Sequence, residues 1–299
     1  MLHITNGSSV ELNRTNLGAV IYWNDVLHEG PVPANLSLED LSRLRAGFLS
    51  NYFGISDVSF AERNRDLSAF RDHEEVVLWF EHDLYDQLQL IQLLDWFAHQ
   101  PAPLPKLSLI NIDRYLGHLT AEELLPLFEI RVAVTPEQLR TAAQAWHAFR
   151  SPEPTELADF VGRGTTVLPF LNRALQRHLE QFPALQNGTS RTERQILHLV
   201  SSGHRSFHQL FRADQQMEDA IFMGDTTFRC YLRGLAQARR PLLQESEAGY
   251  EMTAFGRAVL DNAEDHVRAN GINRWLGGVH LCEGAPVWRW DADHQRLVP

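Results

Sequence analysis

The sequence predicts an α/β fold: a doubly wound, mostly parallel sheet, followed by a helical region with a winged-helix-like domain and a small C-terminal β-hairpin. Over the first 135 residues, short apolar runs alternate with amphipathic segments, as in parallel strands joined by helices. Beyond residue 135, segments with helical spacing replace the apolar runs. We therefore expect an α/β domain at 1–135, a helical linker region at 136–185 and a winged-helix-like domain with a C-terminal hairpin at 186–299.

The expected strands are rich in β-branched and aromatic residues. They lie at 2–7, 19–23, 75–80, 106–112 and 128–134. The run EVVLWF at 75–80 is almost wholly apolar, which indicates a strand covered on both faces. Helices are expected between the strands, where apolar residues recur every three or four positions, at 37–52, 84–98 and 120–127.

In the second part, Thr135 and Pro136 predict the start of a helix over 135–151. Further helices are expected at 168–182, 189–203, 206–217, 225–238 and 254–265, with a two-stranded hairpin between the last two. Three helices followed by a hairpin is the order of a winged helix, with 225–238 as its recognition helix and Asp225 as the cap. In the tail, the pieces VHL and PVWRW are expected to form a small hairpin.

Charge and composition narrow the class of protein. The net charge of −11 belongs almost entirely to residues 1–135, which carry 19 acidic and 9 basic side chains and are a poor surface for a phosphate backbone. No run is long and apolar enough for a membrane span, and the start lacks a secretory signal. Two cysteines make no disulfide framework. We expect a cytoplasmic protein with no membrane partner.

Polar residues follow four consecutive predicted strands, at the edge of a parallel sheet where ligands bind. They are Asn6, Gly7 and Ser8; Asn24, Asp25, His28, Glu29 and Gly30; Glu81, His82, Asp83, Asp86 and Gln87; and Asn111, Asp113 and Arg114. We predict a site for a small-molecule ligand there.

Structural roles compete with this prediction. Asp83 is well placed to cap the helix that follows, with Asp86 as a capping-box partner. Asn6 and Gly7 also suit a tight turn, and His3 suits the core. Asp113 is also placed to form a surface ion pair with Arg114.

Two pairs, His28-Glu29 and Glu81-His82, each put an imidazole beside a carboxylate. A carboxylate can orient a histidine for general-base or metal-ligand work, so either a divalent metal or a metal-free acid/base pair fits. In catalysis, a histidine of one pair would act as the base and its neighbouring glutamate as the orienter. Asp83 or Asp86 would bind metal or substrate. Because adjacent residues in an extended chain point opposite ways, we expect only one of each pair to face a common site.

Residues 186–243 carry a net charge of +3. On the predicted recognition helix, Arg229 and Arg233 lie four residues apart, opposite Phe228 and Leu232, and are expected to be exposed. This pattern allows contact with nucleic acid, and it equally fits a winged helix used for protein contact or packing.

Short blocks along the chain are distinctive: MLHITNG, VLHEGPVP, FEHDLYDQLQL and INID in the first part, and SRTERQIL, DTTFRCYL, RWLGGVHL and WRWD later. With these blocks the sequence resembles the domain-of-unknown-function family 1835 and the region that often follows that domain. The resemblance implies an α/β N-terminal domain and a bacterial, cytosolic protein. It implies no particular activity.

The leading hypothesis is a two-domain protein that binds a small polar or nucleotide-like ligand at the strand ends, with hydrolysis or transfer of that ligand as the candidate reaction. One rival hypothesis is a ligand-sensing transcriptional regulator that binds DNA through the winged helix. The other is a protein-interaction scaffold without a small-molecule site. No G-x-G-x-x-G or G-x-x-x-x-G-K-[ST] motif indicates a standard phosphate loop.

Overall fold

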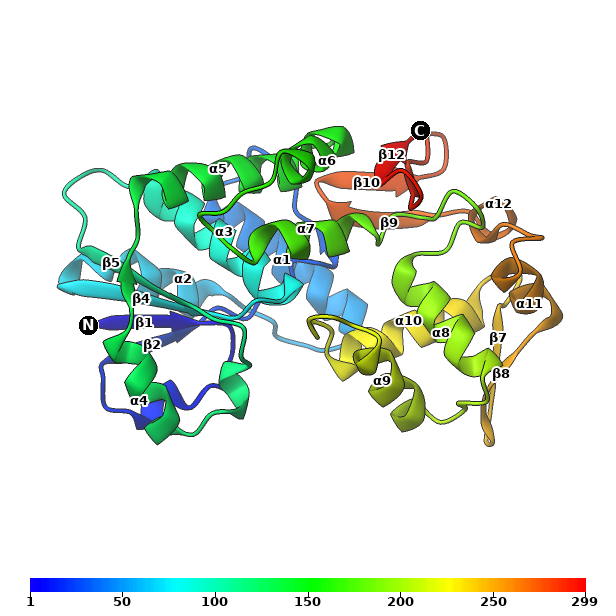
Figure 1. The fold of residues 1–299 in the computed structure, drawn as a ribbon, viewed down its shortest axis with the longest axis horizontal. Helices are drawn as coiled ribbons and strands as arrows, with labels where there is room; N and C mark the ends of the chain where they lie inside the picture. The colour runs from blue at the N-terminus through cyan, green and yellow to red at the C-terminus, as the bar shows by residue number, and fades with distance from the viewer.

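Twelve strands and twelve α-helices follow one another along residues 1–299 in the computed structural model (Figure 1). The strands are β1 (Leu2–Thr5), β2 (Ala19–Tyr22), β3 (Gly30–Pro31), β4 (Glu75–Phe80), β5 (Lys106–Asn111), β6 (Val132–Ala133), β7 (Leu243–Ser246), β8 (Gly249–Met252), β9 (Asn273–Gly277), β10 (Val279–Cys282), β11 (Arg289–Asp291) and β12 (Arg296–Val298). The helices are α1 (Leu38–Phe53), α2 (Ala61–Ser68), α3 (Leu84–Ala98), α4 (Ala121–Glu129), α5 (Pro136–Arg150), α6 (Pro154–Arg163), α7 (Leu171–Leu179), α8 (Arg191–Ser201), α9 (Phe207–Gln216), α10 (Asp225–Gln237), α11 (Ala254–Leu260) and α12 (His266–Asn270).

The mostly parallel sheet predicted for the first part is confirmed. Its order is β2-β1-β4-β5-β6, and the first four strands are parallel. Only β6 runs antiparallel, paired with β5. The chain places β2 on one side of β1 and β4 on the other, so the strand order reverses between β1 and β4.

Both faces of the sheet are covered, as the apolar run of β4 predicts. Alternate residues of a strand point to opposite faces. Val77 and Trp79 accordingly pack with α4 in a small core of ten buried residues, whereas Val76 and Leu78 belong to the main core of 54. Figure 1 shows α3 and α5 on one side of the sheet and α4 on the other.

Helix α3 is the centre of the main core. Eleven of its fifteen residues are buried, because the helix packs against α5 and α7 as well as the sheet. A helix enclosed on nearly all sides is fixed in position, so its first turn is held firmly at the end of β4.

The second part is joined to the first by strand pairing and by a continuous core. The short strand β3 pairs in parallel with β9, and the main core runs from the sheet through α5 and α7 into α8 and α10. Helices α8, α9 and α10 are followed by the antiparallel hairpin β7–β8, at the end of the molecule remote from the sheet (Figure 1). No helix combines the length and the apolar character needed to cross a membrane.

Several local expectations were wrong. The run 128–134 is mostly not a strand, because α4 starts from a Thr120 capping box and continues to Glu129. Asp225 is the first residue of α10 and makes no capping hydrogen bond; Gly224 occupies the N-cap position. The C-terminal hairpin is confirmed as β11–β12, but VHL pairs instead with β9. The elements α2, β3, α12, β9 and β12 were not predicted from the sequence.

Candidate functional site

The carboxyl ends of β1 and β4 meet where the strand order reverses, which is the place where open α/β sheets bind ligands. Asn6 follows β1, and Glu81 follows β4. The Asn6 side-chain amide donates one hydrogen bond to Glu81 Oε1 at 3.2 Å and another to Asp86 Oδ2 at 2.7 Å. The two strand ends predicted to meet are therefore in direct contact.

Three carboxylates form the centre of this site. Ligand atoms of Glu81, Asp83 and Asp86 all lie within 4.8 Å of one another, and none of the three side chains is more than 4% exposed. Local structure explains the positions: Asp83 is the N-cap of α3 and accepts a bond from the Asp86 amide, as predicted. Asp86 does not complete a capping box. Its Oδ1 instead accepts from the Glu81 amide at 2.7 Å, which draws it toward Glu81.

Burial and mutual repulsion make these carboxyls hard to ionise. Burial, followed by the charge of Glu81, raises the pKa of Asp83 to about 8. Burial also raises the pKa of Glu81, and it raises the pKa of Asp86 well above the ordinary value. No lysine, arginine or histidine forms an ion pair with any of the three. Protons or a bound cation must therefore balance the cluster.

Two amide side chains add oxygen atoms beside the cluster. Gln87 and Asn111 both donate to the main-chain oxygen of Glu81, at 2.5 and 3.1 Å. Their own side-chain oxygens are buried and accept no hydrogen bond. Carboxylate and amide oxygens are the ligands that Mg²⁺, Mn²⁺ and Ca²⁺ prefer, so the donor set fits a hard divalent cation.

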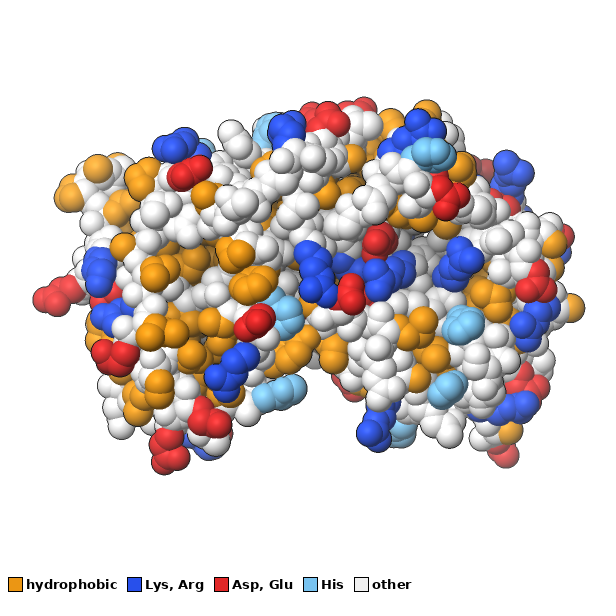
Figure 2. Space-filling view, in the orientation of Figure 1, with side chains coloured by type: hydrophobic (Ala, Val, Ile, Leu, Met, Phe, Trp, Pro, Cys, Tyr) orange, Lys and Arg blue, Asp and Glu red, His pale blue; other side chains and the backbone are white.

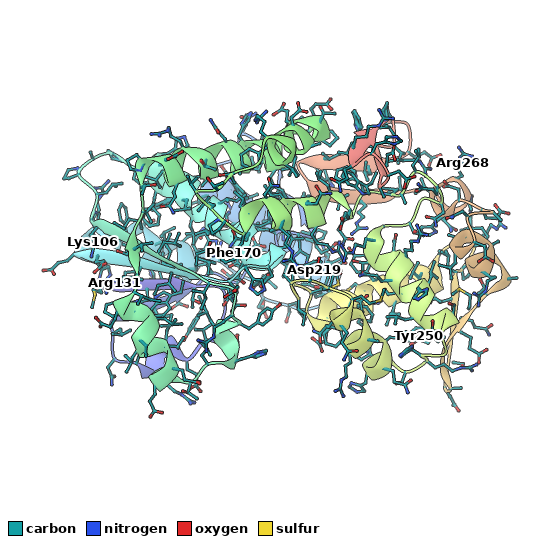
Figure 3. All side chains as sticks on the ribbon, viewed as in Figure 1. Lys106, Arg131, Phe170, Asp219, Tyr250 and Arg268 are labelled. Carbon is teal, nitrogen blue, oxygen red and sulfur yellow. The ribbon has the colours of Figure 1, made fainter.

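A small hollow of about 80 Å³ adjoins the cluster, and Asp83 forms part of its wall. His82 lines it too, with its ring 5.2 Å from that of Tyr115 and 5.9 Å from that of Phe170. Burial lowers the pKa of His82, so its ring is neutral at neutral pH. Figure 2 shows basic and acidic side chains gathered at the centre of this face, and Figure 3 labels Phe170 and Asp219 there.

The hollow is also lined by arginines, which were not predicted from the sequence as part of the site. Arg177 pairs with Glu218 through two bonds of 2.9 and 2.7 Å, while its buried Nη1 has no partner. Arg173 and Arg191 also line the hollow. Arg173 and Arg177 belong to α7, and Arg191 is the first residue of α8. Nothing in the local sequence of α7 shows that this helix packs over the strand ends.

His28 and Glu29 are not part of the carboxylate cluster. His28 is buried against the rings of Tyr85 and Phe222, and neither ring nitrogen has a hydrogen-bond partner. Glu29 points away, toward α10, where it accepts a 2.6 Å bond from the hydroxyl of Tyr231. Of the two predicted pairs, only Glu81 enters the cluster, with His82 at its edge.

Three more of the strand-end residues, Gly7, Ser8 and Asp113, lie outside the cluster. Gly7 is half-buried, and Ser8 and Asp113 are exposed. Asp113 forms no ion pair with Arg114, although its charge acts to raise the pKa of His82. His3 is a core histidine, as expected: its Nδ1 accepts from Trp79 Nε1 at 3.0 Å, and burial lowers its pKa to about 4.

On α10, Arg229 and Arg233 are exposed, as predicted. The Arg229 guanidinium lies 3.7 Å from the centre of the Phe207 ring. The neighbouring face of the helix is covered by α1, where the Cys230 thiol reaches the Tyr52 carbonyl oxygen at 3.6 Å. Only part of α10 is therefore open to a partner.

No protein-family model matches the chain, and no curated protein sequence matches it either.

Proposed function

We propose that the chain is a cytosolic protein whose α/β domain binds a divalent cation with Glu81, Asp83 and Asp86 and, beside it, a small ligand that carries an oxyanion. The observation that supports the proposal is a cluster of buried carboxyl groups that has no basic side chain paired with it. Three buried carboxylates lie within 4.8 Å of one another at the switch point of the sheet, with no paired cation. Buried charges are normally paired or coordinate a metal.

The hollow beside the cluster supports the oxyanion part of the proposal. Its volume of about 80 Å³ suits a phosphate-sized group, whereas sites for whole small molecules are roughly 300–1,000 Å³. The guanidinium groups of Arg173, Arg177 and Arg191, which line the hollow, would supply donors for such a group. A bound cation would polarise the oxyanion, and the neutral ring of His82 would accept a proton during hydrolysis or transfer.

Calorimetric titration with Mn²⁺ tests the cation site. We expect the wild type to bind Mn²⁺ and the double variant Asp83→Asn, Asp86→Asn to bind at least about tenfold more weakly, since asparagine keeps the shape but loses the charge. Asp40→Asn is the matched control. Asp40 is the third residue of α1, as Asp86 is of α3, but it is exposed and should leave Mn²⁺ binding unchanged. Equal binding by wild type and double variant would contradict the proposal.

The blocks that resemble family 1835 supply Asn6, Glu81, Asp83, Asp86 and Asn111. We propose that this cluster is the site that such a family shares. Its members should then bind Mn²⁺ through the equivalents of these residues.

A second candidate function is DNA binding by α8, α9, α10 and the hairpin β7–β8, which follow one another in winged-helix order. The observation that favours it is the exposure of Arg229 and Arg233 on α10. Fluorescence anisotropy with a labelled DNA duplex at low salt is the test. Binding that weakens with salt and with Arg229→Ala, Arg233→Ala would support this function, and no change in anisotropy would remove it.

A further inference from the structure

A cavity of about 470 Å³ lies between the α/β part and the helical part, apart from the carboxylate cluster. Its walls come from four regions of the chain: Gly30 and α1, the turn before α8, α10, and the segment from α12 to β9. The volume falls in the range of about 300–1,000 Å³ typical of small-molecule sites. It is the space into which Glu29 projects.

Four of the 19 residues that line the cavity carry aromatic rings. Phe48 and Tyr52 stack on each other with ring centres 5.1 Å apart, and Tyr231 and Trp275 also line the cavity. Gly30 makes room for this arrangement. Its φ of +78° suits glycine, and a Cβ there would lie 2.2 Å from the ring of Phe48.

The charges of the cavity do not balance. Glu29 accepts from the Tyr231 hydroxyl at 2.6 Å and lies 3.5 Å from the Arg274 guanidinium, which also donates to that hydroxyl. Glu29 and Arg274 therefore form a pair. Glu193, half-buried on the same wall, forms no ion pair of its own, although its charge, with that of Glu29, acts to raise the pKa of Arg274. Its Oε2 accepts the Ser190 amide of the α8 capping box at 2.6 Å.

We infer that this cavity binds a small organic cation, with its ammonium group beside Glu193 and its alkyl groups against the aromatic rings. An ammonium ion is attracted to the faces of aromatic rings as well as to a carboxylate. The inference concerns other residues than the divalent-cation site and stands independently of it.

The first test is titration with tetramethylammonium and choline, alongside dimethylbutanol, the uncharged carbon isostere of choline. We expect the two cations to bind and the neutral isostere to bind at least about tenfold more weakly, because it lacks the charge that Glu193 and the rings attract. Equal affinity for choline and its isostere would overturn the inference. The inference would also be overturned if neither tetramethylammonium nor choline bound to the protein.

The second test removes one charge without disturbing a helix start. Glu193→Gln preserves the capping box, in which glutamine serves as well as glutamate, and we expect it to weaken choline binding about tenfold. Glu123→Gln is the matched control, since Glu123 closes the same kind of capping box on α4, far from the cavity. Equal choline binding by Glu193→Gln and the control would overturn the inference.

The third test removes a ring. Phe48→Leu keeps an apolar side chain but loses the aromatic face, and a loss of about three- to tenfold in choline affinity is expected. Far-UV circular dichroism of the same variant should match the wild type, which shows that the protein is folded. Unchanged choline binding in the folded variant would overturn the role of the aromatic rings.

Discussion

Asp83 both caps α3 and belongs to the carboxylate cluster, and these two roles place opposite demands on its charge. A helix N-terminus favours the ionised carboxylate, whereas burial beside Glu81 favours the protonated form. Burial is the larger effect, because the pKa of Asp83 rises to about 8.

A pH dependence of stability follows from this shift. The folded protein holds the Asp83 proton more tightly than the unfolded chain, whose aspartate pKa is about 3.9. The contribution of Asp83 to the free energy of unfolding is therefore complete below about pH 4 and is lost as the pH rises to about 8. In urea denaturation over this range without divalent cations, Asp83→Asn should lose less stability than the wild type. Parallel pH profiles for the two proteins would contradict the assignment.

The members of the site that are close in sequence were predictable, and those brought by packing were not. Glu81, Asp83 and Asp86 lie within six residues at a strand-to-helix junction, so local geometry alone brings them together. Glu29 was expected at the same site. The direction of its side chain depends on the turn into β3, and this turn points the carboxylate toward α10. Arg177 reaches the hollow only because α7 packs on α3.

Among the elements, those with local signals were the ones predicted correctly. Helix α5 begins at the predicted Thr135 cap, and α3 spans Leu84–Ala98 as expected. Strand β3 has only two residues, and its partner β9 lies more than 240 positions along the chain, so no local pattern indicates it.

The loop between β2 and β3 is held by one residue of α1. Arg45 is fully buried and donates to Asp25 at 2.8 Å, and to the main-chain oxygens of Val26 and Glu29. These bonds fix the segment that carries His28 and Glu29. The loop thus depends on a helix that begins after it in the sequence.

Replacing Arg45 should therefore be costly. Arg45→Met leaves Asp25 buried without a partner, and a loss of about 3–5 kcal/mol in the free energy of unfolding is expected. Arg43→Met is the control. Arg43 lies on the same helix and pairs with Asp40 at the surface, so its loss should cost less than about 1 kcal/mol. Urea denaturation measures both, and similar losses for the two variants would show that the buried pair is not what fixes the loop.

At the scale of the whole molecule, the two parts of the chain share structure. The main core contains residues of the sheet, of α3 and of α8 to α10. The pairing of β3 with β9 joins the parts a second time, close to the tight packing of the β9–β10 turn on the end of α5. We therefore expect both parts to unfold in one cooperative transition, although the sequence divides into regions of different composition.

Gly278 provides the test of this coupling. A Cβ at Gly278 would lie 1.9 Å from the main-chain oxygen of Arg150, so Gly278→Ala forces the β9–β10 turn away from α5 and should cost about 1–3 kcal/mol or more. Gly162→Ala, in α6 with open space around it, should cost nothing. Native-state hydrogen exchange measures the protection of the backbone amides of β4 and of α8 separately. If the parts are coupled, Gly278→Ala lowers protection in both by the same free energy; a loss confined to one of them would mean that the two parts unfold independently.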